Sequence, residues 1–255
     1  MLTKEKLINQ IKEANISSTD TILIHSSLKS LGYVDGGAKT IVEAFVEVVN
    51  NGLLIFPTHT WGVIKEDGQI FDVKNTKSNL GLIPNAALET NKFIRSNHPT
   101  HSVCAYGKKA KEYVMFDNTS TTPCSPNGCF GQLKNMNAKI LFLGTPLSKN
   151  TFIHSIEEEM NVPDRFTNHI YNFKTLDYND NVIEFYMPRH YSTKSAHISD
   201  HYEKLLPILL ENDACVKVYL GDSTSYLVDA TKCYNIVKEL LANNIGTFDD
   251  FTPIK

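Results

Sequence analysis

The chain has 255 residues, of which 42% are hydrophobic and 21% charged, a composition that is typical of globular proteins and argues against global disorder. Its 25 Lys and Arg against 28 Asp and Glu give a net charge of −3, which disfavours a broadly basic nucleic-acid-binding protein. No apolar run approaches the roughly 20 residues of a membrane-spanning helix. The charged N-terminus lacks a signal-peptide pattern, so we expect a cytoplasmic protein.

Helix and strand patterns alternate through the first sixty residues. The apolar run of Ile22, Leu23 and Ile24 is typical of a strand buried on both faces. The predicted order is helix 3–14, strand 21–27, glycine-rich loop 30–37, helix 38–50 and strand 53–58. A strand, loop, helix and strand in this order favour a layered α/β fold.

Later segments continue this pattern without a repeat, a low-complexity tract or a linker. One domain over residues 1–255 is therefore the simplest expectation, with residues 165–200 as its most variable part. The later strands are predicted at 102–105, 139–144, 182–187 and 216–220, and the later helices at 108–116, 151–161, 201–211 and 231–242.

The cysteines and histidines match no familiar metal-binding motif. Five cysteines without an export signal predict reduced thiols, and Cys124 with Cys129 supplies only two of the four ligands usual in a structural zinc site. His98 and His101 lie three residues apart in a stretch that favours extended chain, where such positions point to opposite faces. We expect no metal, and a zinc-dependent hydrolase that uses the histidines is the alternative that chelation would test.

His154 and Glu157 form a candidate acid–base pair at the start of the helix predicted over 151–161. Positions three apart on a helix are neighbours, so the carboxylate can fix the tautomer of His154 and raise the basicity of its other ring nitrogen. We predict Thr151 as the N-cap, which places His154 in the first turn. Ordinary solvated acidic residues at a helix start have the same spacing, so the residues alone leave both interpretations open.

Polar residues also follow the first two predicted strands, in the segments 25–27 (HSS) and 57–60 (PTHT). Ligands of open α/β sheets bind beyond the carboxyl ends of strands, and the helix start after Gly36 and Gly37 offers free N–H groups to a phosphate. Ordinary turn chemistry explains the same residues. A ligand site at this edge is therefore one of two interpretations.

Four blocks of sequence, in order and sensibly spaced, together resemble the aminoglycoside 3-N-acetyltransferase family. They are ILIHSSLKSLGYVDGGAKTIVEA (22–44), GLLIFPTHTW (52–61), RSNHPTHSVCAYG (95–107) and the run from TPCSPNG (122–128) through KILFLG (139–144) to NTFIHSIEEEMNVP (150–163). The last third matches loosely, near VKVYLGDSTSYLVDA. The resemblance implies a single α/β/α domain with a central mixed sheet, unlike the common N-acetyltransferase fold, whose Q/R-x-x-G-x-G/A motif is absent.

The resemblance implies an acetyl-CoA-dependent N-acetyltransferase that works by direct transfer without a metal. His154 and Glu157 match the family's H-x-x-E motif, in which the histidine is the expected general base, and Thr58 matches a polar position near the thioester. A hydroxyl or N–H group near Thr58 or Ser27 would stabilise the oxyanion. The residues expected to line the CoA pocket are His25, Ser26, Ser27, Leu28, Leu31, Gly32, Tyr33, Val34, Pro57, Thr58, Ser102 and Val103.

The expected acceptor is an amine, such as the 3-amino group of a 2-deoxystreptamine aminoglycoside or a related amine. A polycationic acceptor favours an acidic cleft, and we predict Asp72, Glu158 and Asp164 as its contacts, although solvated surface charges have the same appearance. A relative that acetylates another amine, or that only binds CoA, is the alternative. We expect no nucleic-acid or membrane partner, and a monomer or homodimer.

Overall fold

The computed structural model describes residues 1–254 and contains a seven-stranded mixed sheet. Its central strand, β1, pairs in parallel with β2 and β6, whereas the outer pairings are antiparallel. The strand order is β4 (Ile94–Arg95), β5 (Val103–Gly107), β2 (Leu53–Pro57), β1 (Thr21–Ser26), β6 (Lys139–Leu143), β10 (Ser223–Asp229) and β9 (Cys215–Leu220). Because the three central strands are parallel, their carboxyl ends meet at one edge of the sheet.

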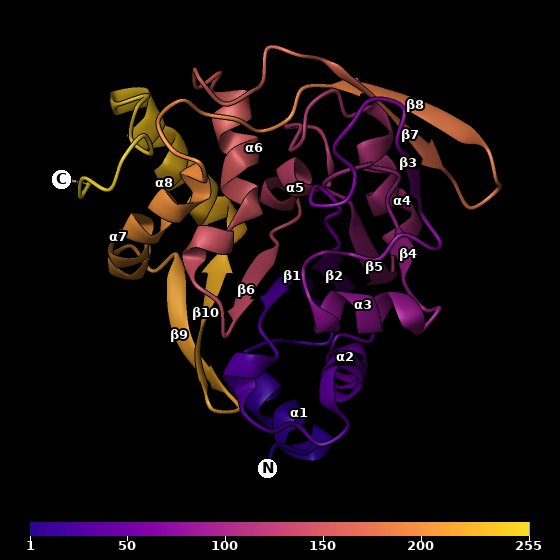
Figure 1. Cartoon of the computed structure of the whole chain (residues 1–255). Helices are drawn as coiled ribbons and strands as arrows, with labels where there is room; N and C mark the ends of the chain where they lie inside the picture. Colours follow the sequence, from indigo (N-terminus) through magenta and orange to yellow (C-terminus); the bar gives the residue numbers. More distant parts are fainter. Residues whose placement is uncertain (255) are drawn as a thin grey trace.

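Helices cover both faces of this sheet (Figure 1). One face carries α1 (Lys4–Glu13), α2 (Gly37–Val48) and α3 (Leu82–Glu89), and the other carries α4 (Ala110–Val114), α5 (Cys129–Gln132), α6 (Thr151–Glu159), α7 (Leu206–Glu211) and α8 (Ala230–Asn243). Short 3₁₀ helices lie at Lys29–Leu31, Met115–Thr119, Leu133–Asn135, Leu147–Lys149 and Ile198–Leu205. Within residues 1–254, no helix combines the length and the apolar character that crossing a bilayer requires.

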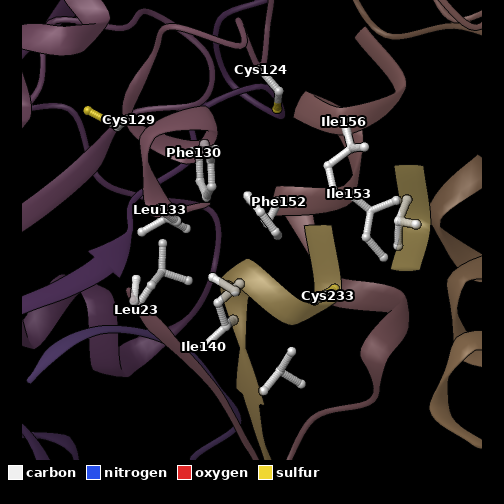
Figure 2. Packing of buried hydrophobic residues seen from close by; sticks show 14 of the residues in the cluster. Leu23, Cys124, Cys129, Phe130, Leu133, Ile140, Phe152, Ile153, Ile156 and Cys233 are labelled. Atoms are coloured by element: carbon white, nitrogen blue, oxygen red, sulfur yellow. The ribbon is translucent and has the colours of Figure 1, made fainter. Parts of the chain in front are cut away.

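The central strands bury alternate residues in two separate cores. Ile22 and Ile24 of β1 pack with α1 and α2, while Leu23 between them packs on the opposite face. Figure 2 shows Leu23 and Ile140 of the sheet in the same core as Phe152 of α6. This packing fixes α6 against the sheet and so determines where the residues on its other side lie.

A separate three-stranded sheet lies beside the edge of the main sheet that ends in β4 (Figure 1). It consists of β3 (Ile70–Asp72), which pairs in parallel with β7 (Tyr171–Leu176), and β8 (Val182–Met187), which pairs antiparallel with β7. Phe71, Phe173 and Phe185 form part of its own small core. Part of the region expected to be variable, residues 165–200, therefore forms regular strands.

Most predicted elements are confirmed to within a few residues, and the strands predicted at 21–27, 53–58 and 139–144 are β1, β2 and β6. The helix predicted over 201–211 is wrong in its first half, because the chain there forms a 3₁₀ helix until Leu205 and α7 begins at Leu206. The sequence analysis missed α3, α5, β3, β4, β7 and β10. Most of these elements are short, and none contains a long apolar run.

Candidate active site

A cavity of about 790 Å³ opens at the carboxyl ends of β1 and β2. His25 and Ser26 reach it from the end of β1, and Pro57 reaches it from the end of β2. Thr145 follows β6, and His154 lies at the start of α6. The parallel centre of the sheet thus gathers these five residues into one wall of the cavity.

His154 is held at one ring nitrogen by two side chains. Its Nδ1 lies 2.7 Å from the Tyr202 hydroxyl and 3.3 Å from Glu157 Oε2, and the Tyr202 hydroxyl also donates a hydrogen bond to Oε2. A hydroxyl that donates to Glu157 must accept from His154, so Nδ1 carries the proton and Nε2 has a free lone pair. Within residues 1–254, Nε2 has no hydrogen-bond partner, and the ring lines the cavity.

Glu157 also binds a buried cation. Arg165 Nε donates to Glu157 Oε1 at 2.7 Å, and Arg165 Nη2 donates to Asp249 at 3.0 Å. Burial raises the pKa of Glu157, but the hydrogen bond and charge of His154 and the charge of Arg165 outweigh it, so the pKa lies below its ordinary value. The carboxylate behind His154 therefore stays ionised.

The sequence of α6 puts the pair in place. Phe152, Ile153 and Ile156 pack into the core (Figure 2), and His154 is left on the side of the cavity. The prediction of Thr151 as the N-cap is wrong. The N-cap is Asn150, whose backbone is non-helical and whose side chain makes no capping hydrogen bond, so Thr151 is already the first helical residue.

Four further histidines form a cluster with His154. The His190 ring centroid lies 4.2 Å from that of His154 and 5.1 Å from that of His101, and the His59 centroid lies 4.7 Å from that of His101. His98 is 5.9 Å from His101, in a loop before β5 and not on opposite faces of a strand as predicted. Burial lowers the pKa of His59, His98, His101 and His190, so these rings are neutral at neutral pH.

Several polar atoms at the cavity have no partner within residues 1–254. They are His25 Nε2, Ser26 Oγ, His59 Nε2 and Thr145 Oγ1, all of which are buried. An unpaired buried polar group costs about 1–3 kcal/mol, and burial lowers the pKa of His25 to about 3. Unpaired groups gathered around one cavity are typical of a site whose ligand supplies the missing partners.

The model of the family described as aminoglycoside 3-N-acetyltransferase matches residues 23–242. The chain belongs to this family. The match confirms the resemblance seen in the four sequence blocks, and it extends into the last third, where the blocks were weakest.

Individual relatives of this acetyltransferase-family chain are distant. An SPbeta prophage-derived aminoglycoside N(3')-acetyltransferase-like protein of Bacillus subtilis is 25% identical over 176 residues, which are 61% of this chain and 64% of that protein. Aminoglycoside N(3)-acetyltransferase III of Salmonella sp is 27% identical over 191 residues, 65% of this chain and 63% of that protein. The chain thus matches less than two thirds of the length of either relative.

Among solved structures, one described as AAC-IIIb binary with CoASH superposes with a TM-score of 0.80 at 18% identity, and the match covers 99% of both chains. This similarity shows that the fold is shared. Together with the mixed sheet between two helical layers, it confirms the predicted α/β/α architecture of the aminoglycoside 3-N-acetyltransferase type.

The residues that the family resemblance assigns to CoA divide into two groups. His25, Ser26 and Pro57 line the cavity, whereas Ser27 and Leu28, which follow directly, do not. The structure therefore turns the chain away from the cavity after β1, whereas after β2 His59 and Trp61 also line it.

The remaining residues of the loop after β1 lie away from the cavity lining. Leu31 and Val34 are buried in the core, and Tyr33 is 72% exposed. Gly32 has a φ of +75°, and a Cβ at this position would lie 1.9 Å from Asp222 Oδ2, so the loop requires glycine here.

Thr58 is fully buried and also lies outside the cavity lining. Its Oγ1 lies 2.9 Å from Ser102 Oγ and accepts from Arg95 Nε at 3.2 Å, while Arg95 Nη2 donates to the Thr58 carbonyl at 2.7 Å. Val103 beside them is buried in the core. The Thr58 hydroxyl is thus engaged in a network that supports the end of β2.

The three acidic residues predicted as acceptor contacts lie outside this cavity. Asp72 Oδ1 accepts from the backbone N–H groups of Lys74 and Asn75 in the turn after β3. Glu158 and Asp164 line a separate hollow, formed by the end of α6 and the chain that follows it. Among the described residues, the charged groups that line the cavity are instead Lys149, Arg165, Arg189 and Asp200.

Sequence reasoning missed Tyr202, Arg165 and His190 as parts of this site. Tyr202 lies 48 residues from His154 along the chain and comes from the 3₁₀ helix before α7. Arg165 follows α6 by a few residues, but arginine after a helix is common and carries no local signal. Only the folded chain brings these residues to His154.

Proposed function

We propose that this chain is an acetyl-CoA-dependent N-acetyltransferase that transfers the acetyl group directly to an amine, with His154 as the general base. The observation that carries the proposal is the state of His154. Its Nδ1 is anchored by Tyr202 and Glu157, while its Nε2 is free at the cavity. An alkylammonium must lose a proton before it becomes a nucleophile, so this reaction needs a base, which a protein that only bound CoA would not need.

The proposed reaction has one transfer step. The amine nitrogen attacks the thioester carbon while one of its protons passes to His154 Nε2, and the C–S bond breaks as the tetrahedral intermediate collapses. The imidazolium then returns the proton to the departing thiolate, so CoA leaves as a thiol. Ionised Glu157, which Arg165 holds in place, stabilises the imidazolium while it exists.

The developing oxyanion needs a hydrogen-bond donor near the thioester. Thr58 has its hydroxyl engaged with Arg95 and Ser102, but Ser26 and Thr145 each present an unpaired side-chain oxygen at the cavity. A donor already in position strengthens its interaction as negative charge develops. We assign the oxyanion role to one of these two hydroxyls.

The donor is proposed to bind at the strand ends. The similar structure AAC-IIIb is described as a complex with CoASH, and the residues expected at the CoA pocket that line this cavity are His25, Ser26 and Pro57. Lys149 and Arg189 are cations of the same cavity and suit the phosphate groups of CoA.

The acceptor is proposed to be the 3-amino group of a 2-deoxystreptamine aminoglycoside or a related amine. The names of the relatives support aminoglycosides. The lining of the cavity also suits amines of lower charge. Asp200 is its single carboxylate among the described residues, whereas a polycation favours a site with several carboxylates.

The test measures free CoA released from acetyl-CoA in the presence of an amine panel. The panel includes 2-deoxystreptamine aminoglycosides, monoamines and amines that carry a carboxylate or phosphonate. The proteins compared are the wild type, His154→Ala and, as a matched control, His169→Ala, whose exposed imidazole pairs with Asp67 outside the cavity. Loss of the general base is expected to reduce kcat by about 10²–10⁴-fold, with acetyl-CoA binding unchanged.

Three results would decide the proposal. Turnover that vanishes in His154→Ala and persists in His169→Ala supports both the reaction and the base. Equal turnover in His154→Ala overturns the role of His154. A wild-type protein that does not bind acetyl-CoA in calorimetry overturns the proposed donor.

A further inference from the structure

Two histidines and a cysteine from three distant segments meet beside His154. His101 comes from the loop before β5, Cys124 from the loop before α5, and His190 from the chain after β8. One ligand atom of each residue lies within 4.8 Å of the ligand atoms of the other two. None of the three is used in the proposed transfer step.

This set of ligand types is selective for a class of metal. A thiolate with two imidazoles suits zinc and similar transition metals and does not suit magnesium or calcium, which prefer oxygen. Zinc bonds of about 2.0–2.3 Å in a tetrahedral site place ligand atoms roughly 3.3–3.8 Å apart. The ligand atoms of His101, Cys124 and His190, which lie within 4.8 Å of one another, therefore need to approach by at most about 1.5 Å.

The groups behind the three residues are those that orient metal ligands. Glu158 Oε1 lies 3.1 Å from His190 Nε2 and accepts from the backbone N–H of Cys124 at 2.9 Å. The Thr100 hydroxyl lies 3.0 Å from His101 Nδ1. Carboxylates and hydroxyls in such positions fix the tautomer of a ligating histidine.

These contacts leave one ring nitrogen of each histidine free. Within residues 1–254, His190 Nδ1 and His101 Nε2 have no hydrogen-bond partner. Both rings line the cavity, and the loop of Cys124 reaches the lining at Pro123. His101 and His190 thus each offer a ring nitrogen to a cation at the cavity, and the buried thiol of Cys124 lies close to both residues.

We propose that His101, Cys124 and His190 bind a divalent cation of the zinc type, with a fourth coordination position open to the cavity. Binding removes the proton of the Cys124 thiol to solvent and leaves both imidazoles neutral. Three protein ligands with one open position are the arrangement of zinc sites that take up a water or another ligand. The cation clamps the chain after β8, and with it His190, to the sheet side of the cavity. This inference does not depend on the proposed acetyl transfer.

The test uses purified full-length protein that has been treated with a chelator and dialysed. Co²⁺ is titrated in and the absorption spectrum recorded, and Zn²⁺ is titrated by calorimetry and thermal unfolding. The variants are Cys124→Ala, Glu158→Gln and, as a matched control, Cys233→Ala, whose buried thiol lies in the core below α6 (Figure 2).

The wild type and Cys233→Ala are expected to bind one equivalent of Zn²⁺, to gain thermal stability from it, and to show a thiolate-to-cobalt charge-transfer band. Cys124→Ala is expected to lose the band. Glu158→Gln is expected to keep the band and to bind about 10–100-fold more weakly, the usual cost of losing an outer carboxylate.

Either of two results would overturn the proposal. One is a wild-type protein that binds neither Zn²⁺ nor Co²⁺ at one equivalent, or that binds Co²⁺ without a thiolate band. The other is a Cys124→Ala protein that is folded by circular dichroism and binds Zn²⁺ as tightly as the wild type. The wild-type cobalt spectrum decides the question even if Cys124→Ala does not fold.

Discussion

The cavity has two walls that are built in different ways. The sheet wall consists of strand ends and the start of α6, and its residues His154 and Glu157 belong to buried hydrogen bonds and ion pairs. The loop wall, residues 189–200, is held by contacts nearer the surface, such as those of Ser192 and Thr193 with Asp164.

The difference separates two requirements of a transferase. Reacting groups must be held within a fraction of an ångström, which a packed sheet and helix provide. Residues that choose the acceptor tolerate more change, and loops on a rigid scaffold usually carry them. We therefore expect substitutions in the sheet wall to affect stability and kcat, and substitutions in the loop wall to affect the KM for the acceptor.

The largest effect is expected at the buried ion pair of the sheet wall. Glu157→Gln leaves the Arg165 guanidinium, 3% exposed, with Asp249 as its remaining anion, and the weakened charged hydrogen bond is expected to lower the free energy of unfolding by about 1.5–3 kcal/mol. Urea denaturation at neutral pH measures this loss. The double variant Glu157→Gln with Arg165→Met is expected to recover most of the stability but not the turnover. A single variant as stable as the wild type would contradict the importance of this pair.

The next effect is on the pH dependence of stability, and it arises from His25 at the end of β1. Burial lowers the pKa of His25 to about 3, whereas an unfolded histidine titrates near pH 6.5. Between these values the unfolded state binds one more proton, so stability decreases as the pH falls, by up to about 1.4 kcal/mol for each pH unit. Urea unfolding between about pH 6 and 4 measures this dependence. The free energy of unfolding of His25→Asn is expected to decrease less steeply with falling pH than that of the wild type, by up to that amount for each pH unit. Identical slopes would refute the burial of an uncharged His25.

A smaller effect is expected at Tyr202, whose hydroxyl contacts both His154 and Glu157. Tyr202→Phe removes the hydroxyl between His154 and Glu157, which is expected to cost about 1 kcal/mol of stability. The less firmly oriented base is expected to lower kcat roughly tenfold without changing the KM for acetyl-CoA. Steady-state kinetics measures both constants, and a change confined to KM would argue against an orienting role.

The smallest effect is expected in the loop wall. Asp200→Asn removes the one carboxylate that lines the cavity among the described residues. An exposed ion pair contributes about 0.2–1 kcal/mol, so the KM for a cationic acceptor is expected to rise about 1.5–5-fold. The KM for acetyl-CoA is expected to stay constant. Asp213→Asn, on the surface after α7, is the control, and equal effects in the two variants would remove Asp200 from acceptor binding.

Sequence patterns alone predicted the layered architecture and one local contact of the site. The apolar runs of β1, β2 and β6 identify buried central strands, because a strand covered on both faces needs no polar alternation. The contact of His154 with Glu157 follows from the helical spacing of three. Both features depend on neighbours in the chain, so the sequence contains enough information to predict them.

Tertiary structure decided which other residues join that pair and which do not. Tyr202 and His190 meet His154 across 48 and 36 residues of chain, and no local pattern encodes such a meeting. Thr58 looked available at the end of a strand, yet Arg95 and Ser102 enclose its hydroxyl. Local sequence determines the period and the spacing of side chains, whereas long-range packing determines which side chains share a cavity, and that packing exists only once the whole chain has folded.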